Sequence, residues 1–158
     1  MHSEIKSLLY EAEDHYLTLE EITTAKLCIA SLQVRLEIYE LLRDQEVTIF
    51  QPIADQLLVT FAQNQRDLEQ ALKRWLLVLR YCTMAMLLNN QEFLQQRLLE
   101  WLIGIVQAHR TQAIETNICQ LLQNQLQEHL NAQQLALLQP FLAQAETTLL
   151  KANAVAEL

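Results

Sequence analysis

Glycine and proline are scarce in this chain of 158 residues. There is one glycine, Gly104, and there are two prolines, Pro52 and Pro140. Glycine-rich loops that hold phosphate groups and sheet folds rich in hairpins both need more turn residues than this. Leucine and glutamine are frequent instead, and both favour helices. The composition therefore predicts an all-α protein.

Cysteine and long apolar runs are also limited. Cys28, Cys82 and Cys119 lie too far apart for a disulfide framework and show no metal-ligand spacing. We interpret them as reduced thiols that fill core space. No apolar run approaches the roughly 20 residues that span a bilayer, and the first fifteen residues lack the apolar segment of a signal peptide. We expect a cytoplasmic protein without membrane insertion.

The charge balance excludes further classes of function. The formal net charge is −8, and an acidic surface repels phosphate backbones, so we expect no nucleic-acid partner. No nucleophile–base pair or metal-ligand spacing stands out. His109 is the one histidine that a haem could use, but next to Arg110 it is better explained as a residue that stabilises a helix end. We therefore predict neither an enzyme nor a metal site.

Apolar residues recur at helical spacing along the first half of the chain. They predict a short helix over about residues 3–14. A capping box of Thr18 and Glu21 starts a second helix, which we expect to end near Arg43. A third helix starts at Thr48.

The second half contains four further expected helices. Asn89 and Asn90 separate the fourth from the fifth, because asparagine tolerates left-handed backbone. Thr111 or Thr116 caps the sixth helix, and Asn131 caps the last.

The helices predict one domain over residues 1–150, with an N-terminal helical arm at about 3–14. The apolar pattern fades after Lys151, so we expect residues 151–158 to form a C-terminal tail. Globin-like orthogonal packing fits seven or eight helices at least as well as a four-helix bundle does.

Two sets of residues recur at spacings typical of one family. The first set is Leu79-Arg80-Tyr81-x-Thr83-x-Ala85, followed by Leu94-x-x-Arg97-x-Leu99-x-x-Leu102. The second set lies upstream and comprises Leu17-Thr18-x-x-Glu21-Ile22, Arg35-Leu36, Thr48-Ile49 and Leu57. Over residues 17–106 the chain resembles the phycobiliprotein family. The resemblance implies a globin-like fold with an N-terminal helical hairpin, which in that family pairs an α-type with a β-type subunit.

The chain departs from this family at the pigment site. Pigment-bearing members attach a linear tetrapyrrole to the cysteine of a C-x-R-D pattern, and the matching positions here are Ala71, Lys73 and Arg74. No thioether bond can form at Ala71. Lys73 lacks the fork that arginine offers a propionate, and Arg74 would repel protonated pyrrole nitrogens. The resemblance therefore implies a lost bilin site and no cofactor.

Bulky residues also stand near the place where the pigment would lie. Trp101 replaces a glycine of the family, and Leu88 begins the segment that replaces its glycine-containing loop. We expect these two side chains and Trp75 to fill the pigment cavity and close it.

We therefore expect a non-pigmented, phycobiliprotein-like interaction protein. It would assist assembly, regulation or adaptation of the phycobilisome or of another photosynthetic complex, in the cytoplasm or at the cytoplasmic face of thylakoid membranes. Pairing with itself and pairing with an antenna subunit both stay open. The expected partner-binding residues are Leu8, Leu9, Tyr16, Leu17, Arg35 and Tyr39.

Two other functions remain alternatives. One is a globin-like sensor or carrier that binds a tetrapyrrole without a covalent bond, with Lys73 and Arg74 meeting its propionates. The other is a role in pigment attachment, which no residue pattern supports beyond the resemblance itself.

Overall fold

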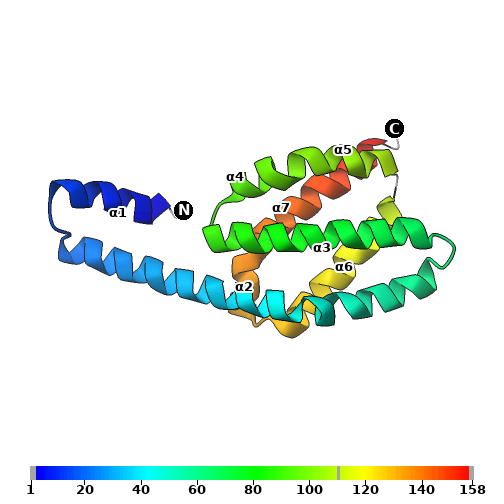
Figure 1. The fold of residues 1–158 in the computed structure, drawn as a ribbon, viewed down its shortest axis with the longest axis horizontal. Helices are drawn as coiled ribbons and strands as arrows, with labels where there is room; N and C mark the ends of the chain where they lie inside the picture. The colour runs from blue at the N-terminus through cyan, green and yellow to red at the C-terminus, as the bar shows by residue number, and fades with distance from the viewer. Residues whose placement is uncertain (1–2, 110, 157–158) are drawn as a thin grey trace.

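The computed structural model describes residues 3–109 and 111–156, and the side chains of residues 3–108 and 111–151 (Figure 1). Its elements are α1 (Ser3–Asp14), α2 (Leu19–Thr60), α3 (Gln65–Leu88), α4 (Gln91–Leu94), the π-helical segment η1 (Gln95–Leu99), α5 (Glu100–His109), α6 (Gln112–His129) and α7 (Ala132–Ala156). No strand occurs within the described ranges, and the all-α prediction is confirmed. The side chain of His109 and all of Arg110, which we expected at a helix end, lie outside the described residues.

Helix α2 is one uninterrupted helix of 42 residues, about 63 Å long at 1.5 Å per residue. The predicted break between Arg43 and Thr48 is wrong. That segment contains neither glycine nor proline, so nothing in it ends a helix. Pro52 lies inside α2 and removes one backbone donor, while Ile49 and Ile53 beside it are buried in the core. Packing therefore keeps the helix continuous where the sequence pattern suggested two.

The predicted helical arm at about 3–14 is α1, and the first part of α2 projects with it. These two segments, residues 3–34, are together called the arm below. Figure 1 shows it projecting to one side of the other helices, with α1 running back along α2. The predicted capping box is present: Glu21 N–H donates to Thr18 Oγ1 at 3.3 Å, and Thr18 N–H donates to Glu21 Oε2 at 2.6 Å. Cys28 Sγ donates to Glu4 Oε2 at 3.0 Å and joins the two helices.

The remaining helices form the body of the molecule around one apolar core. Helix α3 packs against α2 and α7, and α7 also packs against α5 and α6. The largest fully buried side chains are Trp75, Ile38, Ile49, Ile53, Leu57, Leu68, Met86, Leu94, Leu98, Leu99, Leu102 and Ile118. The three cysteines are free and buried. Cys82 and Cys119 fill core space as predicted, whereas Cys28 lies in the arm, outside the core cluster. Burial raises the pKa of the Cys82 and Cys119 thiols well above their usual range.

Two asparagines end and begin helices as predicted. Asn89 has the left-handed backbone conformation, with φ of 48°, and follows the end of α3. Asn131 Oδ1 accepts the Gln134 N–H at 2.8 Å, directly before α7. Short polar side chains that bond their own backbone are good signals for helix boundaries.

Two parts of the second half differ from the sequence pattern. The expected fifth helix contains the π-helical segment η1 between α4 and α5, and apolar spacing does not reveal such a segment. Helix α7 continues to Ala156 rather than fading after Lys151, because alanine-rich sequence stays helical without an apolar stripe. None of the helices in the described part of the chain is both long enough and apolar enough to cross a membrane.

The capping box makes the start of α2 sensitive to acid. The Thr18 backbone N–H, with the nearby side chains, holds the pKa of Glu21 below its ordinary 4.5. A lowered carboxyl pKa means that the cap stabilises fully above pH 4.5 and is lost as the pH falls through the folded value. We expect hydrogen-exchange protection of the first α2 amides to fall in acid.

Two variants check this prediction. Glu21→Gln should remove the pH dependence, whereas Thr18→Ala should lower protection roughly fivefold at every pH, as loss of an N-cap does. Equal acid sensitivity in native and Glu21→Gln protein would contradict the assignment.

Candidate functional site

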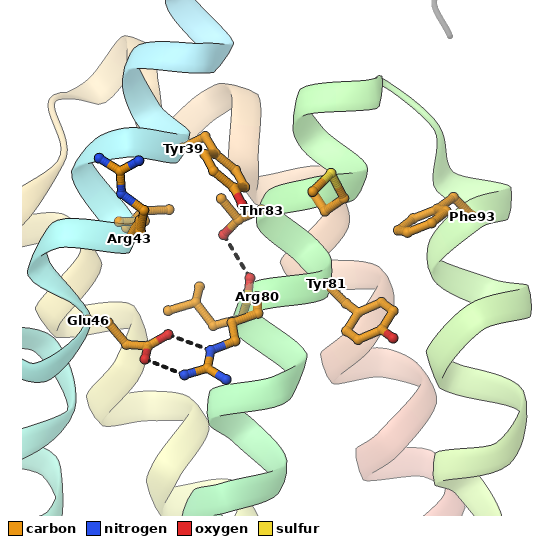
Figure 2. A pocket seen from close by; sticks show the side chains of 10 residues that line it. Tyr39, Arg43, Glu46, Arg80, Tyr81, Thr83 and Phe93 are labelled. Atoms are coloured by element: carbon orange, nitrogen blue, oxygen red, sulfur yellow. Dashed lines mark hydrogen bonds and ion pairs between the residues drawn. The ribbon is translucent and has the colours of Figure 1, made fainter.

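A groove of about 550 Å³ opens between α2, α3 and α4 (Figure 2). Its charged walls are internally paired: Arg80 donates to both carboxylate oxygens of Glu46, at 2.7 and 2.6 Å. Tyr81 and Phe93 stack with ring centroids 6.0 Å apart. The other lining residues are Tyr39, Leu42, Arg43, Leu79, Thr83 and Met84. An apolar, aromatic groove with paired charges suits a helix or an apolar side chain better than a small ion.

The predicted partner-binding residues fall in two places. Leu9 and Tyr16 are exposed on the arm, where Leu8 and Leu17 are half-buried. Tyr39 is half-buried and lines the groove on the body. The arm and the groove are therefore separate surfaces, which the sequence had not distinguished.

Arg35 does not lie on an open face, contrary to the prediction. Its side chain is buried, and Nη1 donates to the backbone oxygen of Met86 at 2.6 Å near the end of α3. The last carbonyls of a helix lack helical partners and carry partial negative charge, so a guanidinium stabilises them. Burial lowers the pKa of Arg35. Arg35 thus joins α2 to α3.

A second hollow of about 400 Å³ lies where α1 meets the start of α2. Four glutamates line it: Glu4, Glu11, Glu20 and Glu21. Among the described residues there is no group of three or more histidine, cysteine or acidic side chains that could hold a metal ion. This hollow therefore adds acidic charge to the arm rather than a recognisable ligand site.

The three residues that match the pigment-attachment pattern, Ala71, Lys73 and Arg74, are buried or paired within the chain. Ala71 is fully buried. Lys73 is exposed and pairs with Glu69 at 2.7 Å, which lowers the pKa of that carboxyl. Arg74 points away from solvent and pairs with Glu115 of α6. No free cation remains among the described side chains at these three positions.

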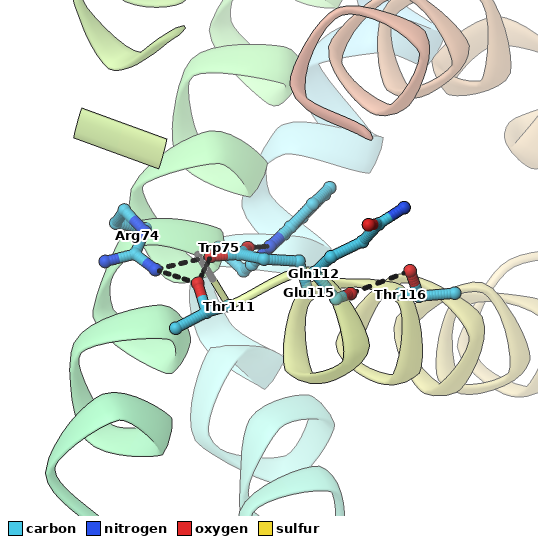
Figure 3. A network of polar contacts seen from close by, with 6 residues as sticks. All are labelled: Arg74, Trp75, Thr111, Gln112, Glu115 and Thr116. Atoms are coloured by element: carbon cyan, nitrogen blue, oxygen red, sulfur yellow. Dashed lines mark hydrogen bonds and ion pairs between the residues drawn. The ribbon is translucent and has the colours of Figure 1, made fainter. Parts of the chain in front are cut away.

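Arg74 belongs to a buried polar cluster with Trp75, Thr111 and Glu115, between α3 and the start of α6 (Figure 3). Arg74 Nη2 donates to Glu115 Oε1 and, at 3.2 Å, to Thr111 Oγ1. Trp75 Nε1 donates to Glu115 Oε2. Thr111 does precede α6, as expected, but its hydroxyl donates to Glu115 Oε1 at 3.1 Å rather than capping the helix. All donors converge on one carboxylate.

These residues do not fit a linear tetrapyrrole. A thioether needs a thiol where Ala71 stands, and pyrrole nitrogens need a free carboxylate where Arg74 stands. Arg74 Nε is buried and has no hydrogen-bond partner.

Only some of the bulky side chains that we expected to fill the pigment cavity lie in the interior. Trp75 is fully buried, and Leu88 is half-buried. Trp101 is 48% exposed, and its Nε1 donates to the backbone oxygen of Arg97 at 2.9 Å. The prediction that Trp101 fills a cavity is wrong, because the ring lies along the outside of its own helix.

The molecule is an all-α domain with a projecting helical arm and a body whose helices enclose one core. The model of one family, described as Phycobilisome protein, matches residues 8–155, and the chain belongs to that family. The predicted family and its globin-like all-α fold are confirmed. None of the curated proteins gives a significant match.

Breaking the buried ion pair should destabilise the protein strongly. Arg74→Met leaves the Glu115 carboxylate buried without its cation, which costs about 3–5 kcal/mol. Arg74→Met with Glu115→Leu removes both charges and should recover most of the loss. Urea unfolding measures the difference.

Lys73→Met supplies a matched control one residue away. Its ion pair is exposed, with 72% of the Lys73 side chain accessible, so little change is expected. A loss in Lys73→Met equal to that in Arg74→Met would contradict a special role for the buried pair.

Proposed function

We propose that the chain is a non-pigmented, phycobiliprotein-like interaction protein rather than an enzyme. It pairs with a phycobiliprotein-like subunit and thereby assists assembly, regulation or adaptation of the phycobilisome or of another photosynthetic complex. Family membership supports the setting, in the cytoplasm or at the cytoplasmic face of the thylakoid.

The arm is the observation that carries this proposal. No side chain of helix α1 is fully buried, although the arm is rich in large apolar residues. Its exposed members are Leu9, Tyr10, Tyr16, Leu19, Ile22, Leu27 and Ile29. Tyr16 is 100% exposed. Large apolar side chains that are exposed together on one projecting segment indicate an interaction site.

The groove on the body suits the apolar side chains of such an arm. The groove is apolar and aromatic, and its lining charges are Arg43, Glu46 and Arg80. Arg80 pairs with Glu46, and Arg43 pairs with Asp44, so the groove offers apolar contact rather than free charge. An amphipathic helix that docks in a groove uses contacts of this kind. An arm from a second copy or from an antenna subunit therefore suits the groove.

The alternative of a tetrapyrrole sensor or carrier gains no support. It requires Lys73 and Arg74 to meet propionates, and these two side chains are paired with Glu69 and Glu115.

Two exposed arm residues provide the test. Leu9→Ser with Tyr10→Ser removes apolar surface that α2 does not cover, so the fold should persist while partner capture weakens about tenfold or more. Sedimentation velocity of the purified chain and pull-down of phycobilisome subunits measure the change.

Val59→Ser is the matched control. Val59 is 82% exposed at the other end of α2, outside both arm and groove, so this variant should behave as the native chain does. Unchanged sedimentation and unchanged pull-down in the arm variant would refute the proposal.

A further inference from the structure

We infer that the buried polar cluster stands in place of the pigment, so that the native fold excludes a tetrapyrrole from this position even without a covalent bond. This deepens the proposed function and rests on its premise that the chain is a non-pigmented member of its family. The inference concerns α3 and α6 alone, and does not involve the arm.

Three donors already bind the carboxylate of Glu115. Arg74 and Thr111 donate to Oε1, and Trp75 donates to Oε2. The Glu115 side chain is 1% exposed, and that of Arg74 is 10% exposed. A buried carboxylate is stable only with a charge partner and hydrogen bonds to its remaining lone pairs. A ligand would have to break these contacts before it could form its own.

The position of the cluster gives it this role. Arg74 stands where the pigment-bearing pattern has its aspartate, and its partner comes from the opposite helix. A carboxylate is present here, but it belongs to Glu115 on α6, and Arg74 and Trp75 on α3 donate to it. The side chains of Arg74 and Trp75 bridge the two helices at this position (Figure 3).

Covalent attachment is blocked by burial as well as by chemistry. Ala71 has no exposed surface, so a thiol placed there would lie inside the core. Restoring the cysteine alone therefore does not restore an attachment site.

Titration of the full native chain with biliverdin, followed by absorbance, tests the inference. We expect no saturable binding at concentrations up to about 100 µM. Saturable binding by the native chain would overturn the inference. Lys73→Ala serves as the matched control at the neighbouring exposed position.

A variant without the cluster tests whether the cluster is what excludes the tetrapyrrole. Arg74→Ala with Glu115→Ala should bind biliverdin at least about tenfold more tightly than the native chain does. A double variant with native circular dichroism and no gain in binding would contradict the inference.

If the double variant does not fold, the reactivity of a thiol placed at position 71 provides a second test of the inference. In Ala71→Cys the new thiol should stay unreactive toward a thiol reagent until the protein is unfolded, like the three buried native cysteines. Rapid reaction in the native state would contradict the inference. Since none of these readouts depends on arm pairing, failure here would leave sedimentation of the arm variant unaffected, and the two proposals fail separately.

Discussion

The continuity of α2 is the constraint on which the rest of the molecule depends. Its second part supplies Ile38, Ile49 and Ile53 to the core, and its first part carries the arm beyond that core. Helix α1 packs along the first part, and none of its side chains is fully buried. The arm leaves apolar surface uncovered. The proposed pairing rests on this surface.

Two buried arginines hold the body together in different ways. Arg35 stabilises the end of α3 from α2, and Arg74 joins α3 to Glu115 on α6. From the sequence alone, Arg35 would be assigned to a partner protein and Arg74 to a ligand. In the structure, each guanidinium binds another part of the same chain. The replacement at position 74 thus does two things at once, since it removes the acid of the pigment-bearing pattern and supplies an internal cross-link. In this account, the proposed absence of pigment and the stability of the fold are connected through one side chain.

The sequence predicts local features better than distant ones. The first helix, the Thr18–Glu21 capping box and the turn at Asn89 follow from neighbouring residues, and all are present. The break after Arg43 was wrong because packing, which the sequence does not display, keeps α2 continuous. The pairing of Arg74 with Glu115 joins residues 41 positions apart, so no local pattern could reveal it.

Hydrogen–deuterium exchange of the chain, alone and mixed with dissociated phycobilisome subunits, tests the central claim most directly. The account predicts slower exchange in the arm, residues 3–34, when the subunits are present, because a partner covers its exposed apolar side chains. Exchange around Arg74 and Glu115 should stay slow in both samples. An arm that exchanges equally fast with and without the subunits, together with protection confined to other surfaces, would contradict the account.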